Sequence, residues 1–197
     1  GPRRVSAVHR MRSRPAGPPP FASSVSRVRD AQVRYSHRTG CPVAVSQLRN
    51  LSVRYFDYSG SVRTGTVVLR ADSVDDVRAV FRRAYEKRFP FKVVRPLEAY
   101  YAGGARSPHD SDVAATNAGN TGAFNCRPVV GNPYRTSQHS YGNAIDYNTI
   151  QNPYVTASRV YPSAGVAYLD RSRYRAGMIL PGSVVASTMA SRGWPWG

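Results

Sequence analysis

The sequence predicts an α+β domain with a small, mostly antiparallel central sheet and flanking helices. Strand-like segments come first, a helical segment follows, and further short strands come after it, without the regular alternation of βαβ units. The chain has 197 residues, the length of one ordinary domain with room for a tail. No apolar run approaches the ~18 residues that would indicate a membrane span.

The first 38 residues are predicted to be a basic, Arg/Pro-rich flexible tail or linker (1–38). They contain nine arginines and one acid, Asp30, together with the turn-rich stretch RPAGPPP at 14–20. Up to about residue 23 this composition favours a flexible or polyproline-like chain, and the residues after it could form a short helix. The composition becomes that of a globular protein from Gly40, so the domain is placed at 39–197.

Two strands are predicted at 51–58 (LSVRYFDY) and 65–71 (GTVVLRA), joined through SGSVRT. A helix is predicted to start after Ser73, which forms a capping box with Asp76 three residues later. The helix ends near Pro90, and its apolar stripe at helical spacing comprises Val74, Val77, Phe81, Ala84 and Tyr85.

Three further segments complete the prediction. FKVVR at 91–95 indicates a short strand. Residues 101–122 are mostly Gly, Ser, Asp, Asn and Ala, which predicts a long loop beside the candidate site. Residues 183–192 are predicted to form a second helix that stops at Gly193.

The chain is strongly basic, with a net charge of +17 at pH 7 and 28 basic residues, all of them arginine except Lys87 and Lys92. A basic surface attracts polyanions whatever their chemistry, so nucleic acid, anionic cell-wall polymer and acidic lipid all fit as partners. The alternative is that arginine replaces lysine through genomic base composition and most of these side chains are solvated surface.

A histidine and an aspartate lie seven residues apart in SQHSYGNAIDYN at 137–148. In a helix His139 and Asp146 would be ~10 Å apart along the axis, and in a strand ~23 Å apart. Gly142 lies between them and permits a chain reversal that could bring the two side chains together. An imidazole and a carboxylate that converge on one point suggest a metal, because Zn²⁺ takes nitrogen and oxygen ligands at ~2 Å.

The same stretch resembles the S-x-H-x-x-G-x-A-x-D signature of zinc D-alanyl-D-alanine carboxypeptidases and related L-alanyl-D-glutamate endopeptidases of peptidoglycan. The signature is matched by Ser137, His139, Gly142, Ala144 and Asp146. Segments around it resemble the secreted and phage-type members in order: NTGAFNCR (120–127), NPY (152–154), YLDRS (168–172), GMI (177–179) and GWPWG (193–197). The resemblance covers roughly residue 37 to the end and implies a D,D-peptidase (Hedgehog-like) fold.

The resemblance implies zinc-dependent hydrolysis of an amide bond in peptidoglycan stem peptides, as a D,D-carboxypeptidase or an L-alanyl-D-glutamate endopeptidase. His139 and Asp146 match the first two zinc ligands, and Arg127 matches the catalytic arginine that faces the scissile carbonyl. Ser137 and Tyr141 are expected to bind substrate, although Ser137 could instead orient the loop. Four tyrosines could line a substrate groove or serve as packing residues: Tyr134, Tyr141, Tyr147 and Tyr154.

The implied setting is a secreted or cell-wall-associated monomer that remodels or lyses the wall, or alternatively a phage endolysin. Anionic wall polymer could bind through the basic tail. The competing hypothesis is a catalytically incomplete basic module that binds wall polymer or nucleic acid. No zinc-finger spacing, RNP-like motif or recognisable helix-turn-helix supports nucleic-acid binding.

Two parts of the family pattern have no counterpart in this sequence: a third zinc ligand, which is a histidine, and the acidic general base just before it. The chain's histidines are His9, His37, His109 and His139, and no acid follows Asp170. We expect both parts just beyond Gly197, so that this chain is truncated, lacks its C-terminal strand and is weakly active. Alternatively, it is a degenerate member that binds without cleaving. His109, in SPHDSD, could supply a substitute ligand, although the resemblance does not support it.

The two cysteines, Cys41 and Cys126, are too far apart in the sequence for a C-x-x-C metal site. In an extracellular wall enzyme they could form a disulfide, whereas in a cytosolic endolysin they would stay free thiols. We expect the bridge. Because Cys126 precedes Arg127, a bridge would tie the arginine's segment to the start of the domain.

Overall fold

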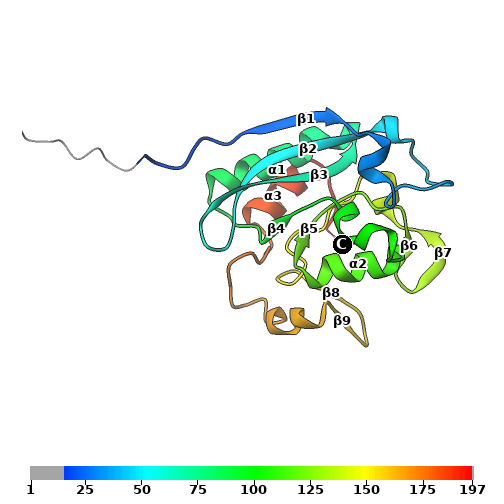
Figure 1. Ribbon diagram of the computed structural model, residues 1–197. Helices are drawn as coiled ribbons and strands as arrows, with labels where there is room; N and C mark the ends of the chain where they lie inside the picture. The colour runs from blue at the N-terminus through cyan, green and yellow to red at the C-terminus, as the bar shows by residue number, and fades with distance from the viewer. Residues whose placement is uncertain (1–15, 197) are drawn as a thin grey trace, which may run out of the picture.

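The computed structural model describes residues 16–196, and its central feature is a three-stranded antiparallel sheet (Figure 1). The strands are β1 (Ser23–Arg27), β2 (Leu48–Phe56) and β3 (Val62–Arg70), with β2 in the middle. β2 and β3 pair along their full nine residues, so that Leu51 lies opposite Val67. This register places Leu51, Val53, Val67 and Leu69 on one face.

Helices α1 (Val74–Glu86) and α3 (Val184–Ser191) pack against that apolar face. In Figure 1 both helices lie beside β1–β3, although the end of α1 and the start of α3 are 98 residues apart in the sequence. The main core forms between them and the sheet. Its members include Leu51, Val53, Val67 and Leu69 from the strands, Val77 and Phe81 from α1, and Val185 and Met189 from α3.

Both predicted strands are present, and each starts three residues earlier than expected. Asp57 ends β2 by organising the turn to β3. Its Oδ1 accepts hydrogen bonds from the backbone N–H groups of Ser59 and Ser61, both at 2.9 Å, and from Ser59 Oγ at 2.6 Å. Its Oδ2 lies 2.8 Å from Arg63 Nε. The Ser59 hydroxyl first, and the Arg63 guanidinium second, hold the pKa of Asp57 well below its usual range.

Replacing Asp57 by asparagine is expected to remove a stabilisation that depends on pH. Because the folded-state pKa is lowered, the stabilisation is fully present above the unfolded value of about 3.9 and is lost as the pH falls through the folded pKa. Urea unfolding of both proteins from neutral pH to about pH 2 should therefore show a difference that shrinks in acid. Asp75→Asn, at an exposed position of α1, is the control. A difference that stays constant with pH would contradict this expectation.

The helix predicted after Ser73 is α1, but the predicted capping box is wrong. Ser73 makes no side-chain cap hydrogen bond, because the 3₁₀ turn Ala71–Ser73 gives it φ −94° and ψ −11° instead of the extended backbone of an N-cap. Asp76 instead accepts a hydrogen bond from Trp194 Nε1 at 2.9 Å and pairs with Arg192 Nη1 at 3.2 Å. These contacts tie the start of α1 to the chain that follows α3.

The prediction of a long loop at 101–122 is wrong, because this segment contains helix α2 (Pro108–Asn117). Ser107 caps the helix by accepting a hydrogen bond from Asp110 N at 3.1 Å, and Pro108 takes the first helical position. The helix buries only Ser111 and Ala115, so it lacks the apolar stripe by which helices are recognised.

The remaining strands are short. β4 (Val93–Val94), within the predicted segment 91–95, pairs in parallel with β5 (Asn120–Thr121). β6 (Pro128–Val129) and β7 (Asn132–Thr136) form an antiparallel pair, as do β8 (Tyr154–Val155) and β9 (Val160–Tyr161). This mixture of helices and small sheets is compatible with the predicted α+β class. None of the helices in residues 16–196 is long and apolar enough to cross a membrane.

Part of the segment predicted as a tail (1–38) contributes a strand to the central sheet. β1 is already paired with β2, and the expected short helix is a 3₁₀ turn at Asp30–Val33. A second core cluster follows from this packing, formed by Val28, Val33, Val43, Leu48, Val68, Phe124 and Cys126. Cys41 and Cys126 form a disulfide at the edge of this cluster. The part of the predicted tail at 1–15 lies outside the described residues.

Candidate functional site

His139 lies on a 3₁₀ turn, Gln138–Tyr141, that follows β7. Ser137 starts the turn, and its Oγ accepts a hydrogen bond from His139 N at 3.3 Å. Gly142 ends the turn with a φ of 69°, which favours glycine. A Cβ at Gly142 would lie 2.6 Å from Arg70 N, which donates a 2.8 Å hydrogen bond to the Gly142 carbonyl. Gly142 therefore permits both the chain reversal and the close contact with the end of β3.

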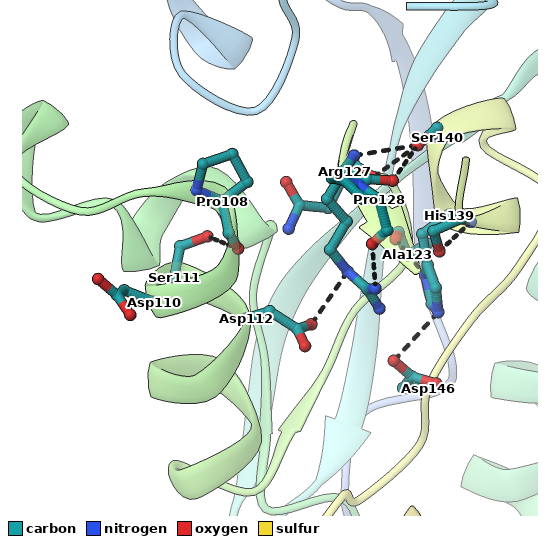
Figure 2. A network of polar contacts seen from close by, with 12 residues as sticks. Pro108, Asp110, Ser111, Asp112, Ala123, Arg127, Pro128, His139, Ser140 and Asp146 are labelled. Carbon is teal, nitrogen blue, oxygen red and sulfur yellow. Dashed lines mark hydrogen bonds and ion pairs between the residues drawn. The ribbon is translucent and has the colours of Figure 1, made fainter. Parts of the chain in front are cut away.

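The ring of His139 is oriented by Ala123. His139 Nδ1 lies 2.7 Å from the Ala123 carbonyl oxygen (Figure 2). A carbonyl only accepts, so Nδ1 carries the proton and Nε2 of the neutral ring keeps its lone pair. Nε2 faces Asp146, with 3.2 Å between Nε2 and Oδ2. The structure thus brings together the two side chains that lie seven residues apart in the sequence.

Asp146 is held by its backbone. It forms an isolated antiparallel bridge with Gly122, in which Asp146 N donates to Gly122 O at 2.9 Å and Gly122 N donates to Asp146 O at 3.0 Å. Adjacent residues, Gly122 and Ala123, therefore fix Asp146 and His139 respectively. The Asp146 side chain is 53% exposed and that of His139 is 14% exposed, so the pair opens to solvent on the aspartate side.

His139 and Asp146 shift each other's pKa. Burial is the largest influence on each group and opposes its charge, but the mutual attraction and hydrogen bond outweigh it. The pKa of His139 is therefore raised, and the pKa of Asp146 is lowered. A nitrogen lone pair and a carboxylate oxygen that face one point also suit a metal cation.

Arg127 runs beside the His139 turn. Its backbone N donates to Ser140 Oγ at 3.0 Å, and its carbonyl accepts from Ser140 Oγ at 3.1 Å and from Ser137 N at 3.0 Å. The side chain is only 10% exposed. Its Nη1 donates to the Pro128 carbonyl at 3.1 Å, and its Nε lies 3.3 Å from Asp112 Oδ1 (Figure 2). The guanidinium is thus fixed on two sides.

Asp112, on α2, is a site residue that the sequence analysis did not identify. Its side chain is 17% exposed, and burial raises its pKa although the charge of Arg127 opposes the shift. The spacing of residues in this segment does indicate that Asp112 faces the body of the protein. Asp112 lies four residues after Pro108 and three before the buried Ala115, the spacing of one helix face. Recognition of the Ser107 cap would have placed it toward the body of the protein.

A pocket of about 290 Å³ adjoins Arg127. It is lined by His109 and Asp112 of α2, by Arg127, and by residues of the β6–β7 hairpin: Pro128, Val129, Val130, Gly131 and Asn132. His109 therefore belongs to the pocket beside the arginine. Within residues 16–196, no group of three or more His, Cys, Asp and Glu side chains could hold a metal ion.

The other predicted site residues differ in their surroundings. Ser137 is 5% exposed and contacts its own turn, and Tyr141 is half-buried. Tyr147 belongs to the main core, whereas Tyr134 and Tyr154 are exposed. Substrate contacts of Ser137 and Tyr141 therefore stay predictions, and Tyr147 has a packing role.

In a comparison with known families, the family model of D-alanyl-D-alanine carboxypeptidases matches residues 131–197. This region includes the turn with His139 and the bridge residue Asp146, and it starts after Arg127 and α2 in the sequence. No curated protein and no solved structure gives a significant match. Residues 131–197, which carry the His139–Asp146 pair, are thus similar to the D-alanyl-D-alanine carboxypeptidase family of peptidases.

Proposed function

We propose that this protein hydrolyses an amide bond in peptidoglycan stem peptides and that His139 and Asp146 hold a zinc ion for this reaction. The family match at 131–197 supports the peptidase class. The observation that carries the zinc assignment is the approach of His139 Nε2 to within 3.2 Å of Asp146 Oδ2. The comparisons give no support to the alternative of a non-enzymatic binding module.

The chemistry of the two side chains fits zinc. Metal-binding histidines usually donate their other ring N–H to a carbonyl or carboxylate, as His139 Nδ1 does to Ala123. Asp146 supplies an anionic oxygen on the open side of the pair. Catalytic zinc sites generally use three protein ligands, and His139 and Asp146 would provide two of them.

A bound zinc ion would supply a Lewis acid that polarises the scissile carbonyl and lowers the pKa of a coordinated water. Arg127 would stabilise the negative charge that develops on the carbonyl oxygen. Its cation is nearly buried, where charge interactions are less screened than in water. Asp112 and the Pro128 carbonyl hold Nε and Nη1 in place, so the guanidinium needs little reorganisation when that charge develops.

The pocket beside Arg127 offers space for the substrate residue next to the scissile bond. Its lining combines Arg127 and the α2 residues His109 and Asp112 with the β6–β7 hairpin, which contributes mainly small and aliphatic residues. Such a pocket suits a small residue such as alanine. Both a D,D-carboxypeptidase and an L-alanyl-D-glutamate endopeptidase have an alanine at the cleaved bond, so the pocket is consistent with either.

His139→Ala is expected to weaken zinc binding by about a hundredfold or more, because it removes the nitrogen ligand. His109→Ala is the matched control, since it removes a neighbouring histidine from the Arg127 pocket instead. Calorimetric titration of each metal-free protein with zinc measures the effect. Equal zinc affinities of the two variants would contradict the assignment of His139.

The reaction itself is tested with two synthetic stem peptides and added zinc. Release of the terminal alanine from a peptide ending in D-alanyl-D-alanine identifies a carboxypeptidase, and cleavage after the first L-alanine identifies an endopeptidase. Both activities should disappear with a chelator and return with zinc. Because residues 16–196 hold no group of three metal-binding side chains, slow cleavage is expected, and a rate no faster than that of the peptide without protein would contradict the proposed function.

A further inference from the structure

A second hollow lies between the segment before β1 and the C-terminal end of α1. Its volume is about 400 Å³. Its lining consists of Pro20, Phe21, Phe56, Arg82, Tyr85, Glu86 and Arg88, and we call it the arginine–aromatic groove. None of these residues lines the pocket beside Arg127, so the groove is separate from the candidate active site.

One wall of the groove is a segment that its composition had placed in the flexible tail. The Tyr85 hydroxyl donates a hydrogen bond to the Pro19 carbonyl, and Arg54 Nη1 donates to the Pro20 carbonyl at 2.8 Å. The Phe21 ring packs against Tyr85, with 5.8 Å between the ring centroids. These contacts attach the segment to β2 and α1, so the groove is part of the folded domain.

Two arginines cover the aromatic rings of the groove. The Arg82 guanidinium lies 5.0 Å from the centroid of Phe21, and the Arg88 guanidinium lies 4.9 Å from that of Phe56. Among residues 16–196, no side-chain hydrogen bond or ion pair engages either guanidinium. The rings therefore orient two cations whose N–H groups are free to donate to a ligand.

Arg88 also has an unusual backbone. It lies just after α1 with a φ of 55°, in a left-handed turn closed by hydrogen bonds from Arg88 N to Tyr85 O at 3.1 Å and from Phe89 N to Ala84 O at 2.8 Å. Glycine is the favoured residue at this position of such a turn. An arginine there strains the backbone, and strain of this kind is found at ligand sites more often than elsewhere.

The arrangement selects a ligand chemistry. Guanidinium groups bind phosphate through paired N–H donors, and the net charge of +17 attracts polyanions from a distance. Proteins that bind single-stranded nucleic acid stack bases on exposed aromatic rings, but the arginines already cover Phe21 and Phe56. We propose that the arginine–aromatic groove binds a phosphodiester polymer without aromatic bases, of the poly(glycerol phosphate) type found in cell walls.

The test compares two double variants of the whole chain that lose the same charge. Arg82→Gln with Arg88→Gly removes both groove cations, and glycine suits the left-handed turn, so this variant is expected to fold. Arg159→Gln with Arg173→Gln removes two exposed arginines elsewhere. In titrations with poly(glycerol phosphate) at low salt, the groove variant should bind about tenfold more weakly than wild type. The control should change by less than about twofold.

A third variant tests whether removing a negative charge from the groove strengthens polymer binding. Glu86 is the acid of the groove lining, so Glu86→Gln should tighten binding by about twofold or more. Equal losses in the two double variants would overturn the proposal, because they would show a general charge effect. The proposal would also be overturned if wild type bound a single-stranded DNA oligonucleotide with the same number of phosphates more tightly than it binds poly(glycerol phosphate). None of these measurements depends on peptidase activity, so the proposal stands or falls separately from the proposed function.

Discussion

Replacing Arg127 by alanine is expected to lower kcat for stem-peptide hydrolysis by about a hundredfold or more, with little change in zinc affinity. The expected loss is large because the guanidinium is only 10% exposed and is held in place by Asp112 and by the Pro128 carbonyl. A fixed cation in a poorly hydrated site stabilises a developing oxyanion more strongly than a mobile surface cation does. Zinc affinity is spared because Arg127 is not one of the proposed ligands.

Arg135→Ala is the matched control for this prediction. Arg135 is an exposed arginine on the neighbouring strand β7, so its removal changes the net charge equally without touching the guanidinium beside Asp112. Steady-state kinetics on a peptide that the wild type cleaves, with zinc titration of each variant, separates turnover from metal binding. An unchanged kcat for Arg127→Ala would show that the arginine has a structural role alone.

Removal of the Cys41–Cys126 disulfide is expected to lower the free energy of unfolding by about 4–5 kcal/mol in the chain-entropy model, for a bridge that spans 85 residues. The bridge limits the unfolded chain, and in the folded protein it fastens the segment around Cys41 to the second core cluster. The backbone N–H of Cys126 also donates a hydrogen bond to the Ser36 carbonyl at 2.9 Å. Replacing Cys126 by serine leaves this backbone hydrogen bond in place.

Urea unfolding of the double variant Cys41→Ser and Cys126→Ser measures this loss. Wild type should lose a similar amount of stability when a reductant is added, whereas the double variant should not respond to it. Wild-type stability that is the same with and without reductant would contradict the prediction. Because Cys126 precedes Arg127, we also expect any peptidase activity to fall together with stability under reducing conditions.

The elements predicted best are those whose signal is local. The middle of β2 alternates apolar and polar residues, β3 carries the apolar run Val67–Leu69, and α1 has an apolar stripe at helical spacing, so each element has a signal in its own sequence. Helix α2 was missed because its face is nearly devoid of large apolar residues and its only local signal is the Ser107–Pro108 cap. The Ser73 capping box failed because a preceding 3₁₀ turn changed the backbone on which such a box depends.

By itself, the sequence determined the α+β class, the central strands and α1. It also indicated a chain reversal at Gly142, between His139 and Asp146. It determined these because propensity, periodicity and the freedom of glycine act over a few neighbouring residues. Only the tertiary structure decided that Ala123 orients His139, that Asp112 pairs with Arg127, and that Pro20 and Phe21 complete a groove on α1. These contacts join segments between 15 and 66 residues apart, and their partners are chosen by the packing of the whole chain.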